Sequence, residues 1–399
     1  MKVELNVNVH YWNKETNYLF DFNYTESEIN NFKVKSSGNI IRNSNEIIFV
    51  TSLKAQQYLL NKYWTNLWLI QFYKDETSLI LPEIQSDKTY VTIKHTFRNQ
   101  ESGSVGYKLK EGDSIKLGKM TLLCKEIKTY NAYDANASKA KEKTFADNDL
   151  NNLYNQLDVL NYGLNLEGVS NNQSGNNPSN NNQSNLNLPR NSRMKKNLNC
   201  CRICLSEEYE TDNPLICPCK CSGTMKYIHI DCLRNWLKSK ISSKNYTYMT
   251  SFTFKALECE LCLMQFPLKI KTKTKTYDLL FTNIPDDSTY IILEQIVKED
   301  QEKTHYLISF KEKNSLKVGR SNDSDIRLSD ISISRYHANL IISDNNIYLD
   351  DNDSKFGSLL LLDSSVTFLL NQSLGLQIGK HFILMEINKT FISSICCNK

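Results

Sequence analysis

The chain has 399 residues, of which 40% are hydrophobic and 23% charged, so it has the composition of a globular protein with two or three domains. Its formal net charge of +4 is too small to favour nucleic acid or a membrane surface as a partner. The first residues lack the apolar core of a signal peptide, and no stretch approaches the roughly 20 apolar residues that cross a bilayer. We therefore expect a soluble, intracellular protein, cytoplasmic or nuclear, without a membrane span.

The first part of the chain alternates apolar and polar residues in short runs separated by turn residues. Such runs occur at 45–50, 67–72 and 90–93. A period of two residues is typical of strands that bury one face. The pattern predicts a β-rich domain over residues 1–128.

Residues 129–198 lose this alternation. Ten of the 21 residues at 171–191 are Asn, and most of the others are Gln, Ser, Gly or Pro. Such a tract cannot bury enough apolar surface to offset its conformational entropy. We expect a disordered, Asn-rich linker.

Cysteine residues cluster after this linker. Nine of the 12 cysteines lie between positions 200 and 262. Seven of them and one histidine form the short pairs Cys201-x2-Cys204, Cys219-x-Cys221, His229-x2-Cys232 and Cys259-x2-Cys262. A structural Zn²⁺ site takes four thiolate or imidazole ligands in a closed tetrahedron, and a short pair lets one turn present two of them. Four pairs therefore predict two Zn²⁺ ions per chain rather than disulfide bonds.

The order of four cysteines, one histidine and three cysteines resembles the RING-CH (RING-variant) family of ubiquitin ligases. The resemblance covers residues 199–267 and includes the segments 201–205, 218–223 and 229–236 around the ligands. It implies a small, cross-braced α+β domain in which the first and third ligand pairs share one zinc. The first site would then hold Cys201, Cys204, His229 and Cys232, and the second Cys219, Cys221, Cys259 and Cys262. Cys200 and Cys217 are alternative ligands by position, but the family spacing favours their neighbours.

The PHD finger, which reads histone tails, has the same ligand order. That family usually carries an aromatic residue two positions before its seventh ligand, where this chain has Leu257. Trp236 lies at helical spacing from Leu233 and fits the helix of a RING-like domain instead. The interval between the sixth and seventh ligands is long for the RING-CH family, and we expect a loop there, around Ser242–Thr250.

RING-type ligases have no nucleophile of their own and act by holding a ubiquitin-loaded conjugating enzyme in a reactive pose. By resemblance, Ile203 in the first zinc loop and Trp236 in the helix would contact the conjugating enzyme. Packing of both side chains against the zinc core is the alternative interpretation.

Short alternating runs return over residues 289–394. The segments 318–320, 332–338 and 353–358 resemble those of the forkhead-associated (FHA) domain, a β-sandwich whose loops bind phosphothreonine. A phosphate binds a guanidinium group, a hydroxyl group and backbone N–H groups. The resemblance gives these roles to the residues Arg320 and Ser334, places Arg335 and Lys355 at the rim, and makes His337 a buried support. Phe356 stands where the family commonly has an Asn that engages the peptide backbone.

A short internal repeat connects the two β-rich segments. Residues 117–123 and 378–384 share one pattern, a Gly-Lys pair between apolar residues. The repeat predicts that both are the closing hairpin of the same kind of sandwich. The first segment has neither Gly-Arg nor Ser-x-x-His before its hairpin, so we expect no phosphate binding there.

The sequence thus predicts a mainly β, multi-domain protein with a zinc domain between an N-terminal β-rich unit and an FHA-like sandwich. The combination favours a RING-type E3 ubiquitin ligase whose partners are a conjugating enzyme and a protein containing phosphothreonine. A non-catalytic, zinc-binding phosphopeptide adaptor is the alternative, and a chromatin reader is a third interpretation.

Overall fold

The computed structural model describes residues 2–11, 19–22, 28–43, 46–73, 76–80, 88–97, 106–130, 199–207, 212–272, 275–281, 284, 288–298, 301–369 and 372–390. The predicted linker at 129–198 lies outside the described residues, except for its first two positions. Strands dominate the regular structure, which confirms the predicted mainly β fold class. Among the described residues, no helix is long and apolar enough to cross a membrane.

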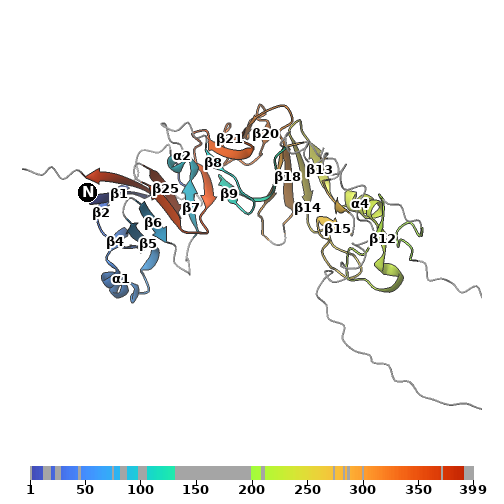
Figure 1. Cartoon of the computed structure of the whole chain (residues 1–399), viewed down its shortest axis with the longest axis horizontal. Coiled ribbons are helices and arrows are strands. Elements are labelled where there is room, and N and C mark those ends of the chain that lie inside the picture. The colour runs from blue at the N-terminus through green and yellow to red at the C-terminus, as the bar shows by residue number, and fades with distance from the viewer. Residues whose placement is uncertain are drawn as a thin grey trace, which may run out of the picture.

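One antiparallel sheet of twelve strands runs through the molecule (Figure 1). Its strands, in spatial order, are β13 (Ser242–Asn245), β14 (Met249–Phe254), β18 (Lys303–Ser309), β17 (Tyr290–Gln295), β10 (Met120–Lys128), β9 (Ser114–Leu117), β23 (Ser358–Leu361), β7 (Thr89–Thr92), β25 (Ser373–Ile378), β26 (His381–Thr390), β1 (Lys2–Tyr11) and β2 (Glu28–Val34).

Two five-stranded sheets pack against this long sheet. One contains β20 (Ile326–Arg327), β19 (Ser315–Gly319), β21 (Ala338–Ser343), β22 (Asn346–Asp351) and β8 (Tyr107–Lys108). The other contains β24 (Val366–Leu369), β6 (Glu76–Ile80), β5 (Thr65–Tyr73), β3 (Gly38–Arg42) and β4 (Ile47–Val50). Each shares a buried apolar core with a different part of the long sheet, so the molecule contains two sandwiches.

We call these the central sandwich, which contains β8–β10 and β17–β23, and the terminal sandwich, which contains β1–β7 and β24–β26. The two sandwiches have equivalent strand orders. Neighbouring strands follow the order β17-β10-β9-β23 in the central sandwich and β1-β26-β25-β7 in the terminal sandwich. Strands β7 and β23 pair with each other and join the two halves of the long sheet.

The two β-rich segments of the chain have exchanged their closing strands. The hairpin β9–β10, from before the linker, closes the central sandwich, whereas β25–β26, at the end of the described chain, closes the terminal one. These hairpins are the two copies of the repeat found in the sequence. The predicted boundaries 1–128 and 289–394 follow chain order, but in space each sandwich takes strands from both segments.

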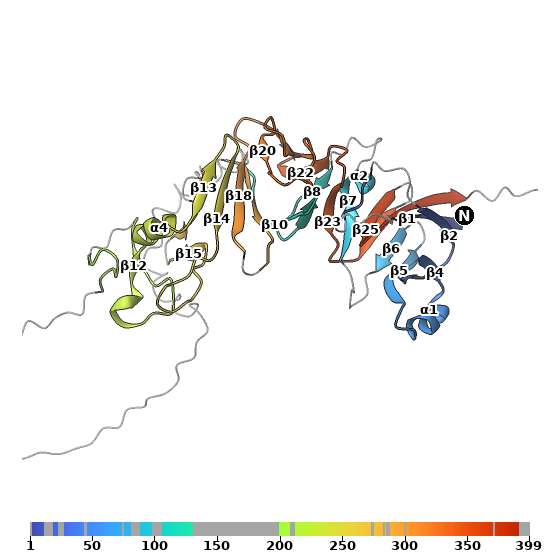
Figure 2. The ribbon, with the colours of Figure 1, turned by 180° about the vertical axis from the view of Figure 1, so that it is seen from behind.

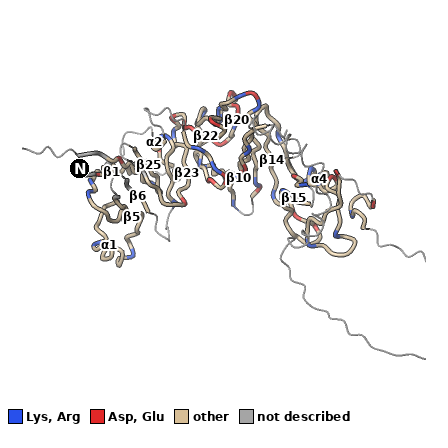
Figure 3. Tube along the Cα trace, in the orientation of Figure 1, with Lys and Arg blue, Asp and Glu red and all other residues tan. Residues whose placement is uncertain are grey.

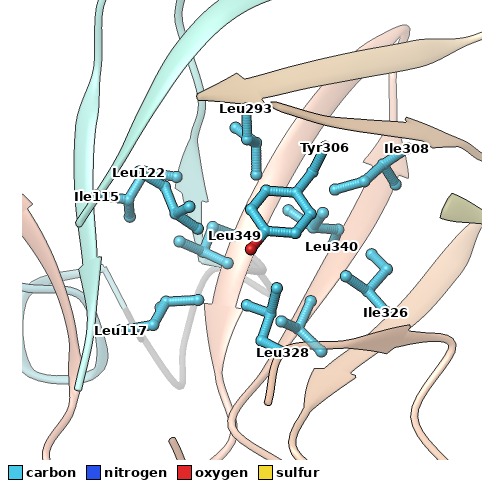
Figure 4. Close-up of a pocket in the computed structure, with 11 residues that line it drawn as sticks. Ile115, Leu117, Leu122, Leu293, Tyr306, Ile308, Ile326, Leu328, Leu340 and Leu349 are labelled. Atoms are coloured by element: carbon cyan, nitrogen blue, oxygen red, sulfur yellow. The ribbon is translucent and has the colours of Figure 1, made fainter. Parts of the chain in front are cut away.

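Apolar side chains from both segments meet in the core of the central sandwich (Figure 4). Ile115, Leu117 and Leu122 of the β9–β10 hairpin surround a small cavity together with residues of β17–β22, including Leu293 and Leu340. The alternation of the hairpin residues brings these side chains to one face of the sheet. Their burial stabilises the pairing with strands that are distant in the sequence.

The helices of the described residues are short, and Ile93 of α2 is buried in the core of the central sandwich. They are α1 (Ser52–Leu59), α2 (Ile93–Thr96), the 3₁₀ helix η1 (Gly223–Lys226) and α4 (Ile230–Lys238). Lys and Arg residues are interspersed with Asp and Glu residues along the trace (Figure 3).

The zinc module, which comprises the described residues of 199–281, lies at the end of the molecule away from the N-terminus (Figure 2). It contains α4 and the ribbons β11 (Leu215–Ile216)–β12 (Ile228–His229) and β15 (Lys269–Lys271)–β16 (Thr276–Asp278). The loop expected around Ser242–Thr250 is instead the hairpin β13–β14, which extends the twelve-stranded sheet. The sequence Met-Thr-Ser-Phe-Thr-Phe of β14 is rich in aromatic and β-branched residues, which favour a paired strand.

Candidate functional site

The zinc module gathers the eight predicted ligands into two clusters. Cys201, Cys204, His229 and Cys232 form one, and Cys219, Cys221, Cys259 and Cys262 form the other, with the ligand atoms of each cluster within 4.8 Å of one another. Tetrahedral Zn²⁺ with bonds of about 2.3 Å separates its sulfur ligands by roughly 3.8 Å. The separation of 3.6 Å between the Cys221 and Cys259 Sγ atoms fits that geometry. Both donor sets therefore fit a structural Zn²⁺ ion, with the cross-braced pairing that the sequence predicts.

Two equivalent turns present the C-x2-C pairs. The carbonyl oxygen of Cys201 accepts a hydrogen bond from the Leu205 N–H at 2.8 Å, and that of Cys259 accepts one from the Leu263 N–H at the same distance. Both leucines have positive φ, 60° and 57°, which turns the chain sharply behind the second cysteine. The turns hold both sulfurs toward the metal position.

Hydrogen bonds to sulfur lower the pKa, and so favour the thiolate form, at three ligands: Cys201, Cys259 and Cys262. Burial raises the pKa of the Cys201 thiol, but backbone N–H donors, including that of His229, outweigh it and lower the pKa to about 6. At Cys259, burial is likewise outweighed by backbone donors and by Arg202, and the pKa is again about 6. Thiolates at neutral pH are the form that Zn²⁺ binds.

Arg202 connects the two metal sites. It lies in the first ligand turn, yet its guanidinium donates to sulfur atoms of the second cluster, at 3.3 Å to Cys221 and 3.4 Å to Cys259. It also donates to the carbonyl oxygen of Met225 at 2.9 Å. A site with four thiolates carries excess negative charge, which a guanidinium offsets. Sequence reasoning missed Arg202, although a cation within the first C-x2-C pair was a usable signal.

Ile203 and Trp236 line one groove on the zinc module. Its other lining residues are Arg202, Met225, Ile228, Leu233, Glu260 and Leu261. Ile203 is 45% exposed and Leu261 59%, whereas the Trp236 ring packs edge-on against Phe266 with a centroid distance of 5.9 Å. The groove therefore combines exposed aliphatic side chains with a supported aromatic ring, a composition typical of protein-binding surfaces.

The loops of the central sandwich bring Arg320, Ser334, Arg335 and Lys355 together. The Arg320 N–H donates to the Ser334 carbonyl oxygen at 3.1 Å, and the Lys355 N–H donates to the Ser334 hydroxyl at 3.1 Å. A side chain at Gly319 would collide with the Arg335 carbonyl oxygen, so the close approach of these loops requires glycine there. Arg320 and Arg335 are exposed, which leaves their guanidinium groups available to an anion.

Buried polar residues hold these loops in place through hydrogen bonds. His337 is fully buried; its Nδ1 accepts the Ser334 N–H at 3.1 Å, and its Nε2 lies 3.3 Å from the Gly357 carbonyl oxygen. Burial lowers the pKa of His337, which keeps the ring neutral. Asp351, also fully buried, accepts hydrogen bonds from Ser354 and Ser358. These contacts match the supporting role expected for His337 and add Asp351, which sequence reasoning missed.

The terminal sandwich contributes one loop segment, residues 21–22, to this site. The Asp21 carboxylate lies 3.2 Å from Lys355 Nζ, and the Phe22 N–H donates to the Lys355 carbonyl oxygen at 3.0 Å. Half-buried Phe356 has Lys355 Nζ 5.4 Å above its ring. Lys355 thus already has an anionic partner, and Phe356 provides no amide for a peptide backbone.

The two sites coincide with two known domain families. Residues 201–262 match the RING-variant domain model, and residues 316–371 match the FHA domain model. Fold and sites together therefore define a chain that combines a RING-variant zinc domain with an FHA domain.

Curated relatives resemble only part of the chain. It is 37% identical over 71 residues to the E3 ubiquitin-protein ligase MARCHF7 of Pongo abelii, which is 18% of this chain and 9% of that protein. It is 34% identical over 85 residues to the E3 ubiquitin-protein ligase MARCHF8 of Bos taurus, 21% of this chain and 24% of that protein. The ERAD-associated E3 ubiquitin-protein ligase DOA10 of Saccharomyces cerevisiae is 42% identical over 72 residues, 18% of this chain and 5% of that protein.

Proposed function

We propose that the chain is a RING-type E3 ubiquitin ligase that recruits substrates containing phosphothreonine. The groove beside the two zinc clusters carries this proposal, because it is lined by both Ile203 and Trp236, the residues expected to contact a conjugating enzyme. The names of the relatives, all E3 ubiquitin-protein ligases, support it. The proposed partners are a ubiquitin-loaded conjugating enzyme and a phosphorylated protein of the cytoplasm or nucleus.

The transfer step follows from positioning alone. No side chain of the groove has to act as a nucleophile, because the thioester between ubiquitin and its conjugating enzyme is already reactive toward an amine. Bound zinc ions would hold the turns that form the groove, and the groove holds the conjugating enzyme with its thioester exposed to a lysine of the substrate. The lysine amine attacks the thioester carbonyl, an isopeptide bond forms, and the cysteine thiol of the conjugating enzyme leaves. The phosphate of the substrate binds Arg320, the Ser334 hydroxyl and the exposed Arg335.

The test of the transfer step is discharge of ubiquitin from a panel of conjugating enzymes to free lysine, with zinc content measured on the same sample. We expect two zinc ions per chain and stimulated discharge that Ile203→Ala abolishes. Leu205→Ala is the matched control, because Leu205 lies in the same turn and is 75% exposed but does not line the groove. Two zinc ions without discharge by any enzyme of the panel would contradict the ligase proposal and favour the adaptor.

The test of recruitment is binding of phosphothreonine peptides. Removing a charged hydrogen bond to phosphate costs about 1.5–3 kcal/mol, so Arg320→Ala should weaken binding at least about tenfold. Arg42→Ala is the control, because Arg42 ends β3 of the terminal sandwich. Equal affinity for phosphorylated and unphosphorylated peptides would contradict this part of the proposal.

A further inference from the structure

The zinc module and the central sandwich share one continuous sheet. Strand β14 lies in the chain between Cys232 of the first cluster and Cys259 of the second, and it pairs with β18 over six consecutive residues, from Met249 opposite Ile308 to Phe254 opposite Lys303. The strand between ligands of two metal sites is therefore part of the twelve-stranded sheet, which shares the core of the central sandwich with the sheet β20-β19-β21-β22-β8. That five-stranded sheet carries most of the loops that hold Arg320, Ser334, Arg335 and Lys355, which we call the phosphothreonine loops.

Side chains of β14 belong to both cores. Met249 is buried in the core of the central sandwich, whereas Phe254 is buried in the core of the zinc module. Phe254 stacks on His305 of β18 with a centroid distance of 5.0 Å and an interplanar angle of 13°. The hydroxyl groups of Thr253 and Thr304 lie 3.1 Å apart. The junction thus has the packed and paired character of a domain interior.

A second connection crosses the same junction. Glu126 of β10 accepts a hydrogen bond from the Tyr290 hydroxyl at 2.7 Å and lies 2.6 Å from Nζ of Lys269 in the zinc module. Arg234 of helix α4, which also carries Trp236, donates to the carbonyl oxygen of Asp278 at 2.7 Å, and Asp278 lies 3.7 Å from Lys269. A chain of direct contacts therefore runs from the groove helix to the central sheet.

We propose that β13–β14 is a positioning element that holds the ubiquitin-transfer groove at a fixed place relative to the phosphothreonine loops. This inference rests on the proposed function and deepens it, because it names the substrate class. The ligase then modifies lysines within a limited range of distances from the phosphothreonine, since a bound peptide presents only those lysines to the thioester. Two modules joined by a flexible linker would sample a broad range of lysines instead.

Backbone direction along β14 identifies a substitution that opens the junction. The Met249 carbonyl oxygen accepts a hydrogen bond from Tyr246 next to β13, and the Tyr248 carbonyl oxygen accepts one from Ser309 next to β18. Because successive residues of a strand point their N–H and C=O groups to opposite sides, Thr250 faces β18 and Ser251 faces β13. Thr250→Pro therefore removes a hydrogen bond of the junction, whereas Ser251→Pro removes one within the hairpin and is its matched control.

The experiment uses the full chain with phosphothreonine peptides that carry a single lysine, placed from about 4 to about 20 residues from the phosphothreonine, a reach of up to roughly 70 Å. We expect ubiquitin transfer in one window of spacings to exceed transfer at the others by about tenfold or more. Thr250→Pro should flatten this profile, while Ser251→Pro should keep it. In both variants, the rate of ubiquitin discharge to free lysine and the affinity for phosphothreonine peptides should equal those of the unchanged protein.

A second variant applies if the proline at 250 prevents folding. Lys269→Glu places a third carboxylate beside those of Glu126 and Asp278 and should broaden the profile, and the double variant with Glu126→Lys should restore it. A flat profile in the unchanged protein, or the same window in Thr250→Pro with its zinc and peptide binding intact, would overturn the inference.

Hydrogen exchange separates this inference from the proposed function. Slow exchange of the Thr250 and Leu307 amides in the unchanged protein is expected from the six-residue pairing, and fast exchange there would overturn the fixed junction whatever the activity. Absence of discharge to free lysine, or of phosphopeptide binding, would instead refute the proposed function.

Discussion

Because the two sandwiches have exchanged their closing strands, a substitution far from Arg320 in the sequence should destabilise the sandwich that carries Arg320 more than a substitution nearer to it. Leu122 of β10 and Ile383 of β26 occupy equivalent positions in the two copies of the repeat, and both are at most 1% exposed. Leu122 is buried in the central core and Ile383 in the terminal core. Leu122→Ala should therefore destabilise the sandwich that carries Arg320, although Ile383 is much closer to Arg320 in the chain.

The magnitude follows from complete burial. Replacing a fully buried Leu or Ile by Ala costs about 3 kcal/mol, because the lost transfer free energy adds to that of the cavity. For a sandwich of this size, each kcal/mol lowers the unfolding temperature by roughly 4–8 °C. Leu122→Ala should thus lower the unfolding temperature of the central sandwich by roughly 10 °C or more, and Ile383→Ala should leave that sandwich nearly unchanged.

The assay is amide hydrogen exchange over β17 and β1, with phosphopeptide binding followed against temperature as a second readout. Strand β17 pairs with the hairpin of Leu122, and β1 pairs with that of Ile383. We expect Leu122→Ala to accelerate exchange in β17 and Ile383→Ala to accelerate it in β1. The opposite assignment, with Ile383→Ala opening β17, would refute the exchanged arrangement.

Three further predictions concern the two sites. Arg202→Ala removes a charged donor to Cys259, so the second cluster should bind zinc about tenfold or more weakly in a chelator competition, with the first cluster as internal control. Burial lowers the pKa of His337 in the folded protein below its value in the unfolded chain, so the unfolded chain binds the proton first as the pH falls below about 6.5. Stability in chemical denaturation should therefore fall from pH 7.5 to 5.5, and His337→Gln should reduce that loss; an unchanged slope would count against the neutral, buried ring. Asp21→Asn removes the charge beside half-exposed Lys355 and should raise phosphopeptide affinity by at most about fivefold, a surface ion pair being worth up to about 1 kcal/mol. Weaker binding in this variant would mean that Asp21 helps to hold the loop.

The zinc clusters were predictable from sequence because their information is local. Each ligand pair spans one turn, so spacing alone indicates that two sulfurs point the same way. The cross-braced assignment came from family resemblance, and the clusters in space contain the same eight residues. The roles of Ile203 and Trp236 stay predictions, although the structure places both in one groove.

The strand exchange was not predictable, because strand pairing is decided by contacts between distant segments. The repeats at 117–123 and 378–384 have the same alternation, so each is compatible with either sandwich. The strand character of β14 was missed for a related reason, since its partner β18 lies about fifty residues later in the chain. Asp21 likewise reaches Lys355 only because the two sandwiches lie side by side.

The exchanged hairpins also constrain how the chain folds as it leaves the ribosome. Strands β9 and β10 are synthesised more than 160 residues before β17, so β17 and β23, which flank them in the sheet, do not exist during that interval. At 5–20 residues per second this interval lasts roughly 10–30 s, much longer than the time in which a hairpin forms. The nascent chain therefore exposes an unpaired apolar strand edge while the zinc ligands are still being synthesised. A chaperone that covers this edge, or early zinc binding by the growing chain, would decide what fraction of the chains folds rather than aggregates.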